Sequence, residues 1–185
     1  MEVFYIDSKQ FNNKGLTKRE VEIGVGRLVV DFIAEMHYGL RNREIIIENK
    51  KPRFKSAPIH FSISHSRNIV LAGFNTSPVG VDVEYLKLRN FGAILKYLKS
   101  EHIEASMESF YAFWTAYEAK IKLQEEPKSA LTMNLLPEFI LSVACSQSLD
   151  IENEIKIYEV KSLEGSGLFF EKVETPLFIK EKIKC

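Results

Sequence analysis

The chain has 185 residues, of which 45% are hydrophobic and 27% are charged, so it can bury a core as one domain or as two small halves. Its 25 Lys and Arg residues equal its 25 Asp and Glu residues, which argues against a general nucleic-acid binder with a basic excess. The two cysteines, Cys145 and Cys185, show neither metal-ligand spacing nor a disulfide framework, and we expect two reduced thiols without a role.

Membrane and export signals are not expected either. No apolar segment approaches the length that a bilayer-spanning helix needs. The first residues, "MEVFYIDSKQ", carry acids and a lysine where a signal peptide would carry an apolar run. The sequence therefore predicts a cytoplasmic protein with no membrane partner and no nucleic-acid partner.

The first predicted element is a helix. In "LTKRE", Thr17 and Glu20 have the spacing of a capping box, and apolar residues then recur at helical spacing as far as Met36. Gly39 is expected to end this helix.

The next segments indicate strands. Residues 44–48, "EIIIE", predict a short strand, and residues 48–55, "ENKKPRFK", predict a charged loop that contains a proline. Residues 59–64, 68–75 and 79–84 then predict a three-strand meander with turns at "HSRN" and "NTSP".

The second half repeats this order of helix and strands. Residues 91–100 and 107–123 predict helices, and strand-like runs follow at 139–145, 154–160 and 167–173.

The repeated order favours an α+β fold of two similar halves, each a helix plus a small antiparallel sheet. We place the join near Leu88, with one half at 1–88 and the other at 89–185. Identity between the halves is negligible, so the repeat is one of architecture.

Three acids could meet at one site. Asp82 and Glu84 lie two apart on a predicted strand, so both emerge on one face and repel each other unless something positive lies there. Trp114, Glu118 and Lys122 follow at successive i, i+4 positions along one stripe of a helix. Three converging carboxylates could hold Mg²⁺, which prefers oxygen ligands. Each feature alone also fits a simpler structure: acids at an exposed strand end, or a surface Glu–Lys pair.

Two further groups suit phosphate. Ser64, His65 and Ser66 end a strand and can donate hydrogen bonds to phosphate oxygens, although they also fit a turn stabilised by serine side chains. The basic segment 50–55 could hold phosphates or could be a solvated turn. A serine nucleophile is less attractive, because no glycine elbow surrounds either serine.

Together, "FSISHS", "GVDVE" and "FWTAYEAKIK" resemble the 4′-phosphopantetheinyl transferases of the two-half type, which activate peptide synthetase, polyketide synthase and fatty-acid carrier proteins. The matches run in family order over residues 50 to 123. The resemblance implies two similar α+β halves, related by a pseudo-two-fold, with the nucleotide in the cleft between them.

The resemblance also implies residue roles. The expected metal ligands are Asp82, Glu84 and Glu118. The expected coenzyme A contacts are Lys51, Ser64, His65 and Lys122. The residues expected to take part in catalysis are Glu118, Lys122 and Asp82, with Glu118 activating the attacking hydroxyl directly or through water.

Four positions depart from the family pattern. Tyr117 replaces a lysine beside the metal-binding glutamate, and Asp31 or a neighbour stands where a phosphate-binding arginine is expected. Lys50 and Arg67 each replace a glycine. The first two departures remove positive charge near the expected coenzyme A site, whereas the metal ligands are intact.

The implied reaction is a Mg²⁺-dependent transfer of 4′-phosphopantetheine from coenzyme A to a serine of an apo acyl or peptidyl carrier protein, with release of 3′,5′-ADP. This is an activity of the holo-acyl-carrier-protein synthase type, expected of a monomer. The carrier presents an acidic helix, so we expect a basic rim to meet it, at Lys87, Arg89, Lys96 and Lys99. Two alternatives stay open: a metal-dependent phosphodiesterase, and a non-catalytic scaffold of the same fold.

Overall fold

The structure, a computed structural model, describes residues 1–11, 14–41, 43–150, 154–163, 167–173 and 179–181. Its helices are η1 (Ser8–Gln10, a 3-10 turn), α1 (Lys18–Met36), α2 (Phe91–Tyr97) and α3 (Met107–Leu123). Its strands are β1 (Glu2–Asp7), β2 (Ile45–Glu48), β3 (Lys51–Phe54), β4 (His60–Ser66), β5 (Ile69–Asn75), β6 (Val79–Tyr85), β7 (Ser129–Leu136), β8 (Phe139–Cys145), β9 (Lys156–Leu163), β10 (Gly167–Lys172) and β11 (Ile179–Glu181). Within the described ranges, no helix is long and apolar enough to cross a membrane.

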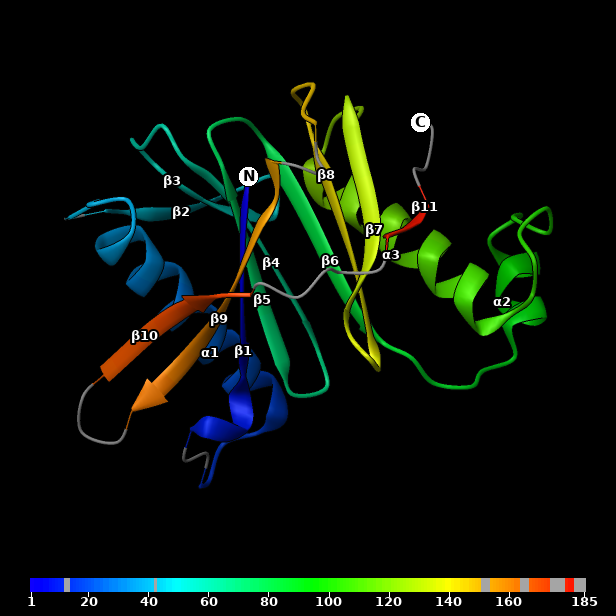
Figure 1. The fold of residues 1–185 in the computed structure, drawn as a ribbon, viewed down its shortest axis with the longest axis horizontal. Helices are drawn as coiled ribbons and strands as arrows, with labels where there is room; N and C mark the ends of the chain where they lie inside the picture. Colours follow the sequence, from blue (N-terminus) through cyan, green and yellow to red (C-terminus); the bar gives the residue numbers. More distant parts are fainter. Residues whose placement is uncertain (12–13, 42, 151–153, 164–166, 174–178, 182–185) are drawn as a thin grey trace.

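Two sheets carry the fold, which is α+β as the sequence predicts (Figure 1). The larger sheet has the order β10-β9-β1-β5-β4, in which β1 and β9 are parallel and the other pairs antiparallel. The smaller sheet has the order β11-β7-β8-β6 and is antiparallel throughout. Strands β2 and β3 form a separate hairpin.

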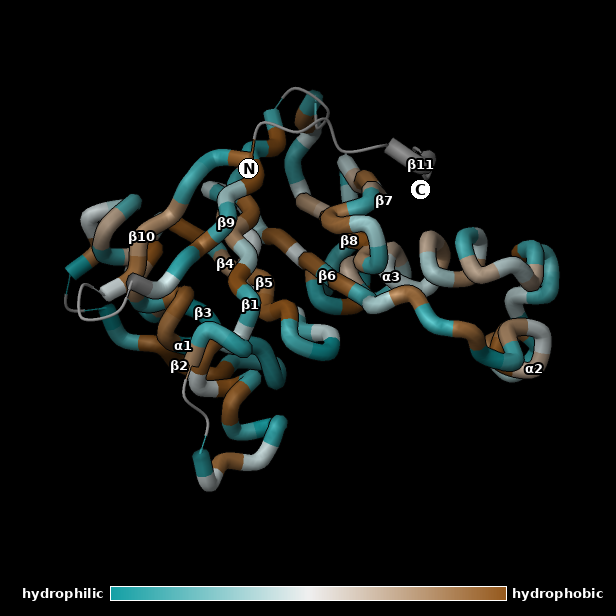
Figure 2. Tube along the Cα trace, turned by 60° about the horizontal axis from the view of Figure 1, so that its bottom comes forward, coloured by the Kyte–Doolittle hydropathy of each residue, from teal (hydrophilic) through white to brown (hydrophobic). Residues whose placement is uncertain are grey.

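The two sheets pack against each other through a shared core. Val79, Val81 and Val83 of β6 are buried there, in one cluster with residues such as Val3 of β1 and Leu71 of β5. Figure 2 shows these central strands as largely hydrophobic. Helix α1 belongs to a second cluster on the other face of the larger sheet, and α3 contributes Ala119 and Leu123 to a cluster with Ala144 of β8. The layers therefore run α1, larger sheet, smaller sheet, α3.

Helix α1 begins and ends where its sequence predicts. The Thr17 hydroxyl accepts the Glu20 N–H at 3.3 Å, and the Glu20 carboxylate accepts the Thr17 N–H at 2.8 Å, which completes the capping box. The helix ends at Met36, and Gly39 follows with φ 65, a left-handed value that suits glycine.

The predicted meander is wrong in its last strand. Strands β4 and β5 pair as expected, but β6 leaves their sheet and pairs with β8. In the other direction, β9 and β10 join the larger sheet beside β1. The sheets therefore exchange strands across Leu88, and the proposed division of the chain there stays a prediction. Strand pairing depends on long-range packing, which a local apolar pattern does not specify.

The predicted charged loop at 48–55 is also wrong in part, because β3 occupies its second half. Asn49 and Lys50 form a two-residue hairpin turn in which both φ angles are positive, 49 and 64. Pro52 lies within β3, which is tolerated in a two-stranded hairpin with open edges. Strands β1, β7 and β11 were not predicted at all.

Candidate functional site

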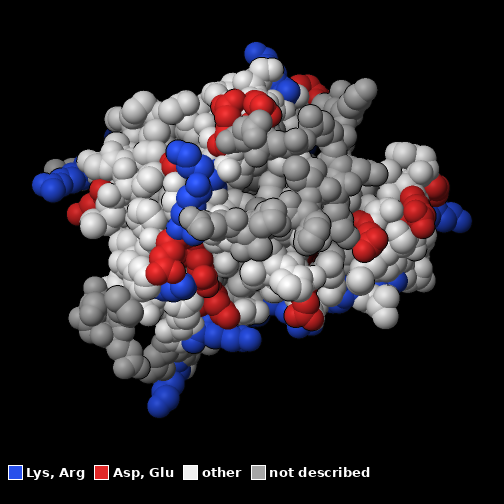
Figure 3. Space-filling model, viewed as in Figure 1, with Lys and Arg blue, Asp and Glu red and all other residues white. Residues whose placement is uncertain are grey.

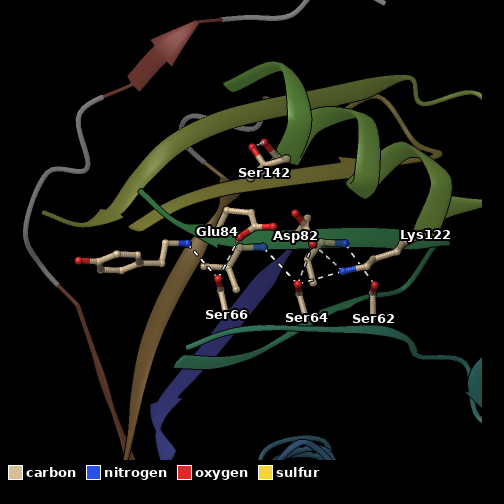
Figure 4. Close-up of polar contacts among 11 residues, drawn as sticks. Ser62, Ser64, Ser66, Asp82, Glu84, Lys122 and Ser142 are labelled. Carbon is tan, nitrogen blue, oxygen red and sulfur yellow. Dashed lines mark hydrogen bonds and ion pairs between the residues drawn. The ribbon is translucent and has the colours of Figure 1, made fainter. Parts of the chain in front are cut away.

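The expected site residues other than Lys51, which lies on β3, come from three elements that meet where the two sheets adjoin. Strand β4 is an edge strand of the larger sheet, and β6 is an edge strand of the smaller one. Alternate residues of β4, Ser62, Ser64 and Ser66, hydrogen-bond to β6 (Figure 4). Helix α3 lies on the other side of β6 and contributes Lys122 to the same cluster (Figure 4).

Gly80 lets α3 lie directly on the backbone of β6. A Cβ at this position would come within 2.0 Å of the Ala119 carbonyl oxygen and 2.6 Å of the Leu123 amide nitrogen. Real Cβ atoms essentially never make contacts this short, so only glycine fits between strand and helix. Because Asp82 and Glu84 share the face of Gly80, the close approach brings α3 within reach of both acids.

Asp82 forms an ion pair with Lys122. The Lys122 ammonium lies 2.7 Å from Asp82 Oδ1, and the Ser64 hydroxyl donates to the same oxygen at 2.7 Å. Asp82 is buried at 6% exposure, whereas the Lys122 side chain is 28% exposed. The positive partner that the spacing of Asp82 and Glu84 demands is thus a lysine of the chain itself.

Glu84 and Glu118 complete the acidic group. Ser66 donates to Glu84 Oε2 at 3.0 Å. Burial raises the pKa of Glu118, and the negative charges of Asp82 and Glu84 raise it further, while Lys122 opposes them. Glu118 therefore lies close enough to Asp82 and Glu84 for their negative charges to act on it.

The three acids do not form a closed metal site in the described part of the chain. Within the described ranges, no three carboxylate, imidazole or thiol side chains are gathered closely enough to hold a metal ion. Asp82 Oδ2 is nevertheless buried and accepts no hydrogen bond from the part of the chain that the structure describes. A buried carboxylate oxygen in that condition is costly, and a hard cation would satisfy it. This unpaired oxygen is the feature of the site that fits a divalent cation, while the three acids are not gathered around one point in the described structure.

The Ser64 hydroxyl is fully used inside the protein. It donates to Asp82 Oδ1, accepts the Lys122 ammonium at 2.9 Å and accepts the Val83 N–H at 3.2 Å. A hydroxyl has one hydrogen and two lone pairs, so this arrangement leaves nothing for a phosphate. The expected contact of this side chain with coenzyme A stays a prediction that requires the hydroxyl to exchange a partner.

His65 points to the opposite face of β4 from its serine neighbours, as alternation requires. Its Nδ1 lies 3.3 Å from the carboxylate of buried Glu22 on α1, and its side chain is 46% exposed. It also lines a cavity of about 480 Å³ between α1, the β2–β3 hairpin and β4. His65 is therefore separated from the Asp82–Lys122 pair by the width of the strand.

Lys51 lies at the other end of the site. Its ammonium donates to the Val79 carbonyl at 2.7 Å, at the start of β6. Burial lowers the pKa of Lys51 to about 8, and the neighbouring Lys122 lowers it too, while Glu125 opposes them. Lys51 and Lys122 thus place two positive charges near each other along β6.

Two of the departures from the family pattern have a backbone explanation. Lys50 and Arg67 both replace a family glycine, and both have positive φ angles, 64 and 54. Both residues thus adopt a backbone conformation that favours glycine, at a cost of about 1 kcal/mol or more at each position. The Arg67 guanidinium lies 3.3 Å from the centre of the Tyr85 ring, which offsets part of that cost.

The other two departures lie away from the acids. Tyr117 is 43% exposed and stacks on Phe113, with ring centres 6.0 Å apart and planes at 23°. Asp31 pairs with Arg43 at 3.1 Å. Neither side chain contacts the acidic group in the described structure, so both departures concern packing and surface pairing.

The sequence reasoning missed two features of the site. It read Ser66 as a possible phosphate donor at a strand end and not as a partner of Glu84, and it did not consider Ser62 or Gly80. The alternation Ser62-x-Ser64-x-Ser66 was a usable signal, because three hydroxyls on one face of a predicted strand need polar partners.

Comparison with known proteins places this geometry in context. The chain is 30% identical to 4′-phosphopantetheinyl transferase ffp of Bacillus subtilis over 110 residues, which are 53% of this chain and 49% of that protein. It is 32% identical to a 4′-phosphopantetheinyl transferase of Bacillus pumilus over 111 residues, 54% of this chain and 48% of that protein. The chain is thus similar to curated 4′-phosphopantetheinyl transferases over about half of its length. The matches span about half the length of these curated relatives. No family model matches the chain.

Proposed function

We propose that this protein transfers 4′-phosphopantetheine from coenzyme A to a serine of an apo acyl or peptidyl carrier protein and releases 3′,5′-ADP. The observation that carries the proposal is the pairing of Lys122 with buried Asp82, beside Glu84 and Glu118, at the junction of the sheets. The relatives' names supply the reaction class.

The chain's own residues have distinct tasks in this proposal. The serine oxygen of the carrier attacks the β-phosphorus of coenzyme A, and the bond from that phosphorus to the bridging oxygen breaks as 3′,5′-ADP leaves. Lys122 exchanges its contact with Asp82 for a phosphate oxygen of coenzyme A. Lys122 and Lys51 then stabilise negative charge on the phosphate oxygens, a contribution of about 3 kcal/mol for a well-placed donor. Glu118 accepts the serine proton directly or through water, and its raised pKa suits a general base.

Asp82, Glu84 and Glu118 are the proposed holders of Mg²⁺, with Asp82 Oδ2 as the oxygen that the described protein leaves unpaired. When bound, the cation would supply positive charge to the diphosphate and help to align it.

The carrier protein is proposed to dock on the exposed surface formed by α2 and the residues on either side of it, 87–99. Lys87, Arg89, Lys96 and Lys99 are all exposed there, as the expected basic rim requires. Leu88 and Tyr97 lie among them, each 86% exposed, and offer apolar contact. On the face in Figure 3, acidic and basic side chains lie close together.

The remaining expectations belong to the same proposal. Each sheet carries one long helix on its outer face, which supports two similar halves with a pseudo-two-fold between them. The proposed enzyme is of the holo-acyl-carrier-protein synthase type, and we propose that it acts as a cytoplasmic monomer.

The deciding experiment incubates the protein with Mg²⁺, coenzyme A and several apo carrier proteins, and measures the carrier mass. Transfer adds phosphopantetheine to the carrier and needs Lys122; Lys122→Met should lose it. Lys120→Met is the matched control, because Lys120 lies on the same helix and pairs with Glu126 at the surface. Hydrolysis of coenzyme A without a carrier would favour the phosphodiesterase instead. Failure to bind coenzyme A at all would favour the non-catalytic scaffold.

A further inference from the structure

Strands β4 and β6 lie next to each other but belong to different sheets. Three serine side chains of β4 make the hydrogen bonds to β6 that backbone carbonyls would make in a paired sheet. The backbone N–H groups of Val81, Val83 and Tyr85 are bonded by serine hydroxyls of β4. Their N···O distances are 3.2, 3.2 and 3.0 Å, to Ser62, Ser64 and Ser66 in that order. The two sheets are thus joined at this edge by side chains (Figure 4).

Two of the three hydroxyls also hold a carboxylate. Ser64 donates to Asp82 Oδ1 at 2.7 Å, and Ser66 donates to Glu84 Oε2 at 3.0 Å. Each therefore accepts from the backbone of one β6 residue and donates to the side chain of the residue before it. Among the described contacts, Ser62 accepts its backbone N–H without touching a carboxylate.

We propose that Ser66 is a positioning residue that fixes the carboxylate of Glu84 for a divalent cation. This inference rests on the proposed function, which makes Glu84 a metal ligand. Glutamate has three rotatable side-chain bonds, and a fixed hydrogen bond to Oε2 limits them while leaving Oε1 for the cation. Loss of a hydrogen bond to a metal ligand typically weakens metal binding about 10- to 100-fold.

Ser66 is a better subject for a test than Ser64. Ser64 also accepts a hydrogen bond from Lys122. Its loss would therefore alter the Asp82–Lys122 pair as well as the row of serine hydrogen bonds between β4 and β6, which we call the seam. Ser66 holds Glu84 and one backbone N–H. Ser62 is its matched control, because it makes the same backbone contact two positions earlier on the strand.

The experiment measures Mn²⁺ binding by electron paramagnetic resonance, without coenzyme A or carrier, together with thermal unfolding. Ser62→Ala and Ser66→Ala should lower the Tm by similar amounts, since each leaves one β6 N–H unbonded. Only Ser66→Ala should weaken Mn²⁺ binding, about tenfold, whereas Ser62→Ala stays within about twofold of wild type. Ser66→Thr, which restores the hydroxyl, should recover the affinity.

Kinetics provide a second readout. In the transfer assay, Ser66→Ala should lose turnover at limiting Mn²⁺ and regain most of it at saturating Mn²⁺, with the KM for coenzyme A changed less than kcat. A residue that only stabilises the seam would show no such recovery. If Ser66→Ala does not fold, Ser66→Cys keeps the volume with a weak donor and should show the same loss of Mn²⁺ affinity.

Three outcomes overturn the inference, and the first two are Ser66→Ala binding Mn²⁺ as wild type does and Ser62→Ala weakening Mn²⁺ binding equally. Wild-type protein that binds no Mn²⁺ also overturns it. The mass assay on carrier proteins decides the proposed function separately, so the two failures are distinguishable.

Discussion

Gly80→Ala should separate helix α3 from strand β6 and disable the site without touching a charged residue. The added Cβ would lie 2.0 Å from the Ala119 carbonyl oxygen, whereas ordinary contact begins at 3.4 Å. The helix must therefore retreat by about 1.4 Å, because the obstructing atoms are backbone and not the end of a flexible side chain. Such a shift would disrupt the 2.7 Å contact between Lys122 and Asp82.

The expected cost in stability is about 3 kcal/mol, at the upper end for overpacking, because neither backbone can rotate away. For a chain of this length the Tm should fall by about 6–12 °C. Urea denaturation gives the free energy of unfolding, and the transfer assay gives kcat.

Gly24→Ala is the control, since Gly24 lies on the exposed face of α1 with nothing within 4 Å of its added Cβ. It should instead stabilise the protein by about 1 kcal/mol, the helix-propensity gain. A Gly80→Ala protein within 0.5 kcal/mol of wild type, roughly the range of neutral surface changes, would refute the close approach.

Three further predictions address single charges and one aromatic. Lys122→Met should cost about 2 kcal/mol of unfolding free energy, less than for a fully buried pair because the lysine is 28% exposed, and adding Asp82→Asn should recover part of it in urea denaturation. The pKa of Lys51 is lowered from 10.5 to about 8 in the folded protein, so the unfolded chain binds more protons between these two pH values. The free energy of unfolding should therefore rise with pH across that interval. Equal slopes of unfolding free energy against pH in wild type and Lys51→Met would contradict this. Tyr117→Lys would restore the lysine of the family pattern, but it would also remove the stack of Tyr117 on Phe113. We expect a calorimetric Kd for coenzyme A within about twofold of wild type, a change under 0.5 kcal/mol, and a loss of about 1 kcal/mol in stability. Clear tightening would show that the added charge reaches the diphosphate.

The helices were predictable because their signals are local. Thr17 and Glu20 mark the start of α1, and α3 occupies the same residues, 107–123, that its apolar surface predicts. The partners of β6 were not predictable in this way. Val79, Val81 and Val83 would suit burial in either sheet, and the choice depends on Leu141 and Val143, about 60 residues later in the chain.

The candidate site was predictable as a set of residues but not as an arrangement. Spacing alone put Asp82 beside Glu84 and Glu118 beside Lys122. It could not reveal that Lys122 would neutralise Asp82, or that Ser64 would spend its hydroxyl on the same carboxylate. These contacts form only when β6 lies next to β4 although β5 separates them in sequence, and no local pattern encodes that neighbour.

Two glycines explain how β6 reaches this position between the layers. Gly73 of β5 faces Val81, and a Cβ there would come within 2.4 Å of the valine side chain. Gly80 faces α3 in the same manner on the opposite side of the strand. Strand β6 is therefore held between β5 and α3 at two close contacts, one made by the Val81 side chain against Gly73 and one made by the backbone of α3 against Gly80. The acids that follow Gly80 are placed within reach of Lys122 on one element and of Ser64 and Ser66 on another. The chemistry proposed for this site thus depends on two positions that carry no functional group at all.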